Sequence, residues 1–199
     1  MESHLEQDII LEDNVAYLRP LNAGDIENLI EFAKNEPELY KYSSIPTTGR
    51  DNLTNYIDQA LQKKDTKTEY PFIIFDKRTN EYAGTTRFYD IQPNQKTLQL
   101  GYTWYGGRFH GTGLNKHCKF LLLQYAFEAL QVERVEFRAD NENARSIAAM
   151  KSIGCTVEGV MRNHIFRHDG SRRDTIVLSI LHDEWFSSIK ENILNKINA

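Results

Sequence analysis

Residues 101–115 read GYTWYGGRFHGTGLN and connect a candidate strand to a strongly amphipathic candidate helix. Gly111 and Gly113 let the backbone take conformations closed to other residues and approach a ligand closely. Unpaired amide groups of the first helical turn then point into one concavity, together with the positive end of the helix dipole. The stretch therefore predicts a phosphate site, with Arg108 at its mouth as a charge-assisted partner.

Two well-known phosphate-binding loops do not fit this stretch. No Gly-Lys-Ser/Thr follows, which excludes a Walker loop, and the spacing RxxGxG over residues 108–113 differs from the dinucleotide pattern GxGxxG. For a glycine-bearing turn taken alone, a flexible connection without a ligand is the alternative interpretation.

Hydrophobic periodicity on either side of this loop predicts a mixed α/β chain. Strands are expected at 15–21, 70–75, 82–91, 97–105, 135–139, 156–160, 164–167 and 175–181. Helices are expected after Asn22, around 53–61, from Gly113 for four turns, at 143–152 and at 182–198. The three strands from 70 to 105 have short connections and should form an antiparallel meander. We expect one domain over residues 1–199, with its core at about 10–186.

Composition argues against several classes of protein. The formal net charge of −4 disfavours a broad nucleic-acid or anionic-membrane surface. Cys118 and Cys155 form no CxxC pair and the six His show no ligand spacing, so neither a disulfide framework nor a metal site is expected. The polar start and the lack of a run of about 20 apolar residues predict a cytoplasmic protein without a membrane span.

Several motifs in the same order resemble one superfamily. RxxGxG at the end of a meander, opening a long helix, resembles the pyrophosphate-binding motif of the GNAT acetyltransferases. Residues 140–155 are similar to the second cofactor segment of that superfamily, in which an Asn starts a short helix and a Gly closes it, as Asn143 and Gly154 do. The runs 157–162 and 169–174 narrow the resemblance to the branch that contains the ribosomal-protein N-terminal acetyltransferases.

The resemblance implies a fold and a reaction. The expected fold is GNAT-like, with a central, mostly antiparallel, twisted sheet that has a splayed strand pair and is flanked by helices. The expected reaction transfers an acetyl group from acetyl-CoA to a primary amine, on a protein N-terminus or a small molecule. The amine attacks the thioester directly in a ternary complex, without a metal.

The resemblance also assigns residues to the acetyl donor. Gly101, Tyr102 and Thr103 would pair with its pantetheine arm, and one of their amide groups would face the thioester oxygen. Asn143 would bind the arm or a nearby water. The pyrophosphate would rest on backbone amide groups of the loop and helix start, namely Phe109, His110, Gly111, Thr112, Gly113 and Leu114.

The proton-handling residues depart from the common pattern of the superfamily. Met150 stands where a Tyr often acts as general acid, and Arg138 stands where some relatives have a Glu base. The ribosomal-protein branch instead has a Ser three residues after the Asn, so Ser146 is the candidate that protonates the thiolate; a local backbone hydrogen bond is its alternative role. Sequence position alone gives three candidate bases, each with a surface or ion-paired role as the alternative: Glu136, Glu158 and His164.

Two other functions stay open at this point. One is a CoA-binding regulatory module that has lost turnover, because the usual acid and base are missing. The other is a phosphate-binding domain unrelated to CoA. The resemblance also suggests a homodimer, formed through the terminal hairpin and the tail helix.

Overall fold

Three neighbouring strands form the antiparallel centre of the fold in the computed structural model, which describes residues 1–198. They are β3 (Tyr70–Asp76), β4 (Glu81–Gln92) and β5 (Thr97–Tyr105). They pair in sequence order and form the meander that the short connections predicted. β3 is buried along nearly its whole length, as its apolar residues require.

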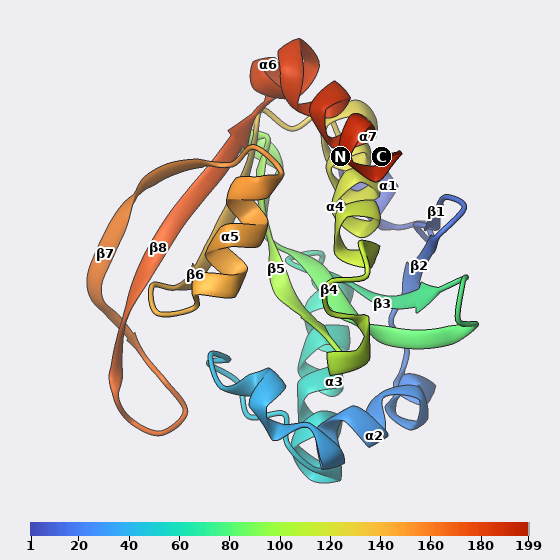
Figure 1. Ribbon diagram of the computed structural model, residues 1–199, viewed down its shortest axis with the longest axis vertical. Coiled ribbons are helices and arrows are strands. Elements are labelled where there is room, and N and C mark those ends of the chain that lie inside the picture. The colour runs from blue at the N-terminus through green and yellow to red at the C-terminus, as the bar shows by residue number, and fades with distance from the viewer. Residues whose placement is uncertain (199) are drawn as a thin grey trace.

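Five further strands extend this centre into one sheet. They are β1 (Leu11–Glu12), β2 (Ala16–Pro20), β6 (Arg134–Asp140), β7 (Thr156–Phe166) and β8 (Arg172–Leu181). The order across the sheet is β1-β2-β3-β4-β5-β6-β8-β7, and the long β7–β8 hairpin forms one side of the molecule (Figure 1). Every neighbouring pair is antiparallel except β5 and β6, so the predicted mixed, mostly antiparallel fold is confirmed.

The parallel pair is joined only at its start. Three residue pairs hold β5 to β6, and the last of them is Gln99 with Glu136. Beyond that pair the two strands diverge, and each continues with a different neighbour, β5 with β4 and β6 with β8. This is the splayed strand pair that the sequence predicted, and it leaves a gap in the middle of the sheet.

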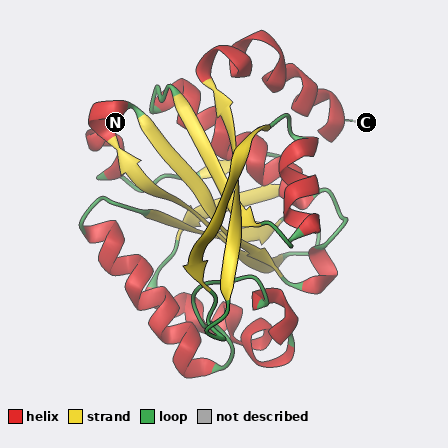
Figure 2. Cartoon of the chain, turned by 90° about the vertical axis from the view of Figure 1, so that its left-hand side faces the viewer, coloured by secondary structure: helices red, strands yellow, loops and turns green. Residues whose placement is uncertain are grey.

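The helices cover both faces of the sheet (Figure 2). The longer ones are α2 (Ile26–Asn35), α3 (Arg50–Asp65), α4 (Leu114–Gln124), α5 (Ala144–Ser152) and α7 (Lys190–Ile197). Trp104 packs against Phe32 of α2, whereas the hydroxyl of its neighbour Tyr105 donates to Asn115 of α4. Because successive side chains of a strand point to opposite faces, α2 and α4 lie on opposite faces.

Short helical segments complete the chain. The α-helical ones are α1 (Glu2–Leu5) and α6 (His182–Glu184). The 3-10 turns are η1 (Ala23–Asp25), η2 (Pro37–Tyr40), η3 (Pro93–Gln95) and η4 (Gly107–Phe109), and the π-helical turns are η5 (Tyr125–Ala129) and η6 (Trp185–Ile189). Over residues 1–198, no helix combines the length and the apolar character needed to cross a membrane.

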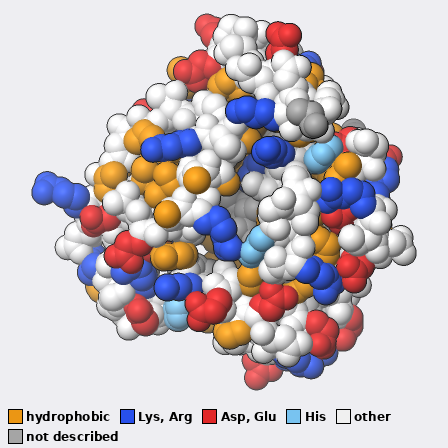
Figure 3. Space-filling view, in the orientation of Figure 1, with side chains coloured by type: hydrophobic (Ala, Val, Ile, Leu, Met, Phe, Trp, Pro, Cys, Tyr) orange, Lys and Arg blue, Asp and Glu red, His pale blue; other side chains and the backbone are white. Residues whose placement is uncertain are grey.

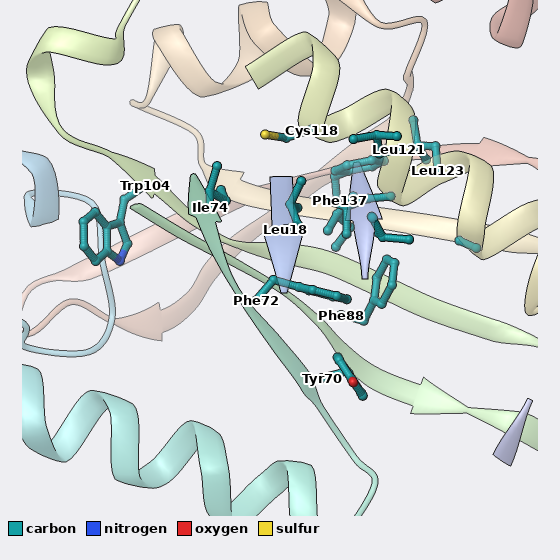
Figure 4. Close-up of a cluster of buried hydrophobic side chains, with 14 of the residues drawn as sticks. Leu18, Tyr70, Phe72, Ile74, Phe88, Trp104, Cys118, Leu121, Leu123 and Phe137 are labelled. Atoms are coloured by element: carbon teal, nitrogen blue, oxygen red, sulfur yellow. The ribbon is translucent and has the colours of Figure 1, made fainter. Parts of the chain in front are cut away.

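One part of the core lies between the sheet and α4, and another part includes buried residues of α2 and α3. Cys118, Leu121 and Leu123 of the helix meet strand side chains that include Phe88 and Phe137 (Figure 4). All five are buried, so α4 is held firmly against the strands. The loop that precedes α4 is therefore presented at a fixed position beside the end of β5.

One prediction of the strands is wrong in detail. Separate strands were expected at 156–160 and 164–167, but β7 runs without a break from Thr156 to Phe166. Two register irregularities bend it, and Asn163 takes a left-handed φ of 55°. These bulges interrupt the alternation of apolar residues, which is why one bent strand looked like two.

Candidate functional site

A cleft of about 580 Å³ opens where β5 and β6 diverge. On the face shown in Figure 3, Lys, Arg and His side chains surround a central hollow. Ten of the residues singled out from the sequence line the cleft: Gly101, Tyr102, Thr103, Phe109, His110, Gly111, Gly113, Asn143, Ser146 and His164. The structure thus brings together three motifs that lie far apart in the chain.

A bulge in β5 shapes one wall of the cleft. Thr85 pairs with Trp104 and Arg87 pairs with Gly101, so Thr86 alone faces both Tyr102 and Thr103. Tyr102 takes a left-handed φ of 50°, which is strained for a bulky residue. Since β6 has already turned away here, no strand of the described chain pairs with that side of β5 beyond Gln99, and the carbonyl of Gly101 accepts from the hydroxyls of Thr86 and Thr103.

Buried polar groups support the bulge from behind. The guanidinium of Arg87 lies 4.2 Å from the ring centroid of Tyr102 and donates to Glu69 at 2.6 Å. The hydroxyl of Tyr56 donates to the carbonyl of Tyr102 at 3.4 Å. The strained residue is therefore held by both its ring and its carbonyl.

The loop before α4 offers free amide groups. Gly111 and Gly113 have φ values of 74° and 86°, and a Cβ at either position would meet no atom within 4 Å. Within residues 1–198, the amides of Gly111, Thr112 and Gly113 have no hydrogen-bond partner. These free amides lie at a helix N-terminus with open space beside both glycines, which is an arrangement that binds phosphate.

Two parts of the predicted phosphate site need correction. The amides of Phe109 and His110 already donate to the carbonyls of Gly106 and Gly107, and the amide of Leu114 donates to the hydroxyl of Thr112, so these three amides are not available. Arg108 does not line the cleft: it pairs with Glu81 at 3.0 Å and lies over the ring of Phe109. Its aromatic neighbours and the nearby carboxylate hold it on the outer side of the loop.

Arg145 lies where a cation was expected. It lines the cleft, and its Nη1 donates to Nδ1 of His110 at 2.9 Å. Nε2 of His110 lies 2.9 Å from the carbonyl of Tyr105 and donates to it in the tautomer that accepts from Arg145. Burial and the charge of Arg145 lower the pKa of His110, so this neutral histidine positions the arginine.

The start of α5 carries the second predicted segment. Oδ1 of Asn143 accepts from the amide of Ser146 at 3.1 Å and so caps the helix. The side-chain amide nitrogen of Asn143 and the hydroxyl of Ser146 have no partner among the described residues. Both residues line the cleft, so both groups are available to a ligand.

The two candidate glutamates lie outside the cleft lining. Glu136 accepts from Arg138 at 2.7 Å and from Arg134 at 3.0 Å. Glu158 accepts from Ser179 and Arg134, and these bonds lower its pKa. Glu136 and Glu158 therefore fit the role of ion-paired residues better than that of a general base.

His164 is the base candidate that does line the cleft. Its Nδ1 lies 3.1 Å from the hydroxyl of Thr175. Burial and the charges of Arg138 and Arg173 lower its pKa, so the ring is neutral at pH 7 and can accept a proton.

Sequence reasoning missed Lys119. It is 6% exposed, lines the cleft and donates from Nζ to Oγ1 of Thr103 at 3.1 Å. Burial lowers its pKa to about 8. A charged residue inside the apolar run 118–123 was the available signal, because Lys and Arg are almost never fully buried without a reason.

Three polar atoms of cleft-lining residues are buried without a partner. They are Oη of Tyr40, Oε1 of Gln99 and Nε1 of Trp104. An unpaired buried polar atom costs about 1–3 kcal/mol, so these atoms in the cleft are ready to bond to a ligand or to water. For metals there is no such indication: residues 1–198 hold no group of three or more His, Cys, Asp or Glu that could bind an ion.

Known proteins resemble this chain in sequence and fold. Residues 16–156 match the family described as the acetyltransferase (GNAT) domain. The uncharacterised N-acetyltransferase p20 of Bacillus licheniformis is 29% identical over 84% of this chain and 93% of its own length. YdaF of Bacillus subtilis, whose name assigns it provisionally to the ribosomal N-acetyltransferases, is also 29% identical, over 84% of this chain and 92% of its own length.

A solved structure agrees with the sequence relatives. A GCN5-related N-acetyltransferase from Brucella melitensis superposes with a TM-score of 0.87 at 25% identity, over 96% of this chain and 86% of that one. The superfamily, the fold and the enzyme class that the sequence predicted are thereby confirmed.

Proposed function

This chain belongs to the GNAT acetyltransferase family, and we propose that it acetylates a primary amine by direct attack on acetyl-CoA in the cleft between β5 and β6. One observation carries the proposal. The free edge of the bulged strand β5 leads into a loop with three unpaired amides, so a single groove offers partners for a thioester arm and a diphosphate.

The donor would lie along this groove. Its diphosphate would accept from the amides of Gly111, Thr112 and Gly113, with Arg145 as the nearby cation. Its pantetheine arm would pair with Gly101, Tyr102 and Thr103 on one side and with Asn143 on the other. Lys119 faces the same gap, and the ammonium protons that Thr103 does not use are available to the arm.

Acyl transfer then needs three events. The amine nitrogen attacks the thioester carbon, and an amide of the bulge stabilises the oxyanion that forms. His164 takes the proton that the nitrogen loses. The carbon–sulfur bond breaks, and the hydroxyl of Ser146 relays a proton to the departing thiolate while it takes up a replacement proton from solvent in the cleft.

Location and assembly belong to the same proposal. Cys118 and Cys155 are both free and buried, which suits a reducing cytoplasm. The β7–β8 hairpin exposes Val157, Val160 and Leu181, and a second copy of the chain covering them would form the homodimer that the resemblance suggests.

Titration calorimetry and thiol release test the assignment together. We expect acetyl-CoA to bind with clear selectivity over ATP, and thiol to be released only when a suitable amine from a library is present. Tight binding with no turnover for any amine would favour the regulatory module. Equal binding of acetyl-CoA and ATP would favour a phosphate-binding domain unrelated to CoA.

A further inference from the structure

The cleft is cationic although the chain is acidic. Four cationic side chains line it, Lys119, Arg138, Arg145 and Arg173, against two acidic ones, Asp90 and Asp140. The formal net charge of the chain is −4. Arg167 pairs with Asp140 and Glu136 pairs with Arg138, which leaves Lys119, Arg145 and Arg173 against Asp90 alone, whose carboxylate accepts from the neutral amide of Gln99 at 2.7 Å. The electrostatic field in the cleft therefore favours an anion.

Arg173 is distinguished from the arginines near it. Arg138 and Arg167 both pair with carboxylates, and Arg172 lies over the ring of Phe166. Arg173 has no carboxylate within 4.0 Å among the described residues. Its Nη1 donates to the carbonyl of Tyr42 at 3.3 Å, and its Nη2 has no partner among the described residues.

The lack of a carboxylate partner is unusual for a side chain in the surroundings of Arg173. The residue is half-buried in the cleft wall, and burial is the main cause that lowers its pKa. Arginine stays charged in proteins, so a half-buried guanidinium without a counter-ion carries a desolvation cost that a bound anion would offset.

One hydroxyl ties Arg173 to the proposed base. Oγ1 of Thr175 lies 3.1 Å from Nε of Arg173 and 3.1 Å from Nδ1 of His164. With a hydrogen on Nδ1, His164 and Arg173 both donate to this oxygen, and Nε2 of the histidine keeps the lone pair that accepts a proton. A group bound by Arg173 therefore lies beside the amine that His164 deprotonates.

We propose that Arg173 binds an oxyanion of the acceptor, so that the substrate is an amine with a carboxylate or phosphate close to its nitrogen. This inference rests on the proposed function and narrows its acceptor. A guanidinium recognises such planar or tetrahedral oxyanions through two parallel N–H donors. A polyamine has no group for this site and would be repelled by it.

Matched acceptors test the inference in the wild-type protein. An amino acid is compared with its carboxamide, phosphoethanolamine with ethanolamine, and spermidine serves as the polycation. We expect kcat/KM to be higher for the anionic member of at least one pair, and the pair that responds identifies the anion. Equal or higher kcat/KM for the neutral members and for spermidine would overturn the inference.

A variant pair tests the residue. Arg173→Gln should lower kcat/KM for the preferred anionic acceptor by about 10- to 100-fold more than for its neutral partner. Arg172→Gln, one residue away and outside the cleft lining, should change neither. Equal losses for both acceptors in Arg173→Gln would indicate a merely structural role and overturn the proposal.

Different results would overturn the proposed acetyl transfer and the proposed oxyanion site at Arg173. Absence of transfer to every amine, or absence of acetyl-CoA binding, overturns the proposed function and this inference with it. Transfer that ignores the anionic group overturns the inference alone.

Discussion

Nζ of Lys119 lies 3.1 Å from Oγ1 of Thr103, and this hydroxyl is its one hydrogen-bond partner among the described residues. The ring of Phe137 lies 5.7 Å away, and no carboxylate pairs with the ammonium. A cation in such surroundings opposes folding, because burial favours its neutral form. Lys119 lies beside the bulge of β5, so this cost in folding stability arises at the wall of the proposed acetyl-CoA groove.

We expect Lys119→Met to stabilise the protein at pH 7. Burial lowers the pKa of Lys119 to about 8, so from there up to the ordinary lysine pKa the unfolded chain binds more protons than the fold. The penalty is complete below pH 8, amounts to about 3 kcal/mol, and disappears as pH rises towards 10.5. Urea unfolding at pH 7 and at pH 10 measures it.

Lys116→Met, on the same helix and without an ion pair among the described residues, is the control and should change stability little at either pH. A loss of stability in Lys119→Met at pH 7 would contradict the expectation. Its acetyl-CoA affinity should fall even while its stability rises, which separates the role in the groove from the role in the fold.

Gly111→Val should weaken acetyl-CoA binding by more than about tenfold. The side chain would occupy the open space that the free amides face, and the left-handed φ would add strain of about 1–2 kcal/mol. Gly170→Val is the matched control, because Gly170 has a φ of 83° and equally open surroundings in the hairpin turn. Calorimetry that finds the two variants equal in affinity would contradict the phosphate site.

His164→Gln should lower kcat by about 100-fold or more. In the wild type, burial and neighbouring arginines lower the pKa of His164, so kcat should rise with pH along a limb whose midpoint lies below the ordinary histidine value of 6.5. The limb should be absent in the variant. His168→Gln, at an exposed position of the same hairpin, should keep both rate and limb. An unchanged limb in His164→Gln would assign the base elsewhere.

Ser146→Ala tests the acid. The hydroxyl has no partner among the described residues, so folding should be unaffected, whereas protonation of the thiolate should slow and lower kcat by about 100-fold. Pre-steady-state thiol release, compared with Ser152→Ala on the same helix, measures it. Turnover equal to wild type with the true acceptor would show that the acid role is wrong.

Periodicity was sufficient to predict most of the strands and helices, whereas the splayed strand pair was predicted only from the family resemblance. The strand from Thr97 to Tyr105 has the predicted bounds, and the helix after Asn143 ends one residue before Ile153, as expected. Local patterns of this kind survive in the structure because each element buries one continuous face. β7 was divided wrongly because bulges shift that face along the strand.

The site was predicted less completely, for physical reasons. Backbone groups at Gly111 and Gly113 follow from the motif itself, since glycine is required there. Arg108 points outward because Glu81, distant in sequence, pairs with it. Lys119 and Arg173 depend on what surrounds them in three dimensions, and no spacing along the chain reveals a buried cation without a counter-ion.

Among the described residues, three register pairs ending at Gln99 and Glu136, with the adjoining bond from the amide of Glu133 to the carbonyl of Lys96, join the first five strands to the last three. The two halves of the sheet therefore meet at a narrow seam, and amides of residues 100–105 that face this seam lack a strand to protect them. Hydrogen exchange of these amides should be fast in the free protein and slow once a ligand is bound between β5 and β6. An extended ligand that pairs with β5 takes the place of a neighbouring strand. Ligand binding therefore completes the hydrogen bonding of the sheet.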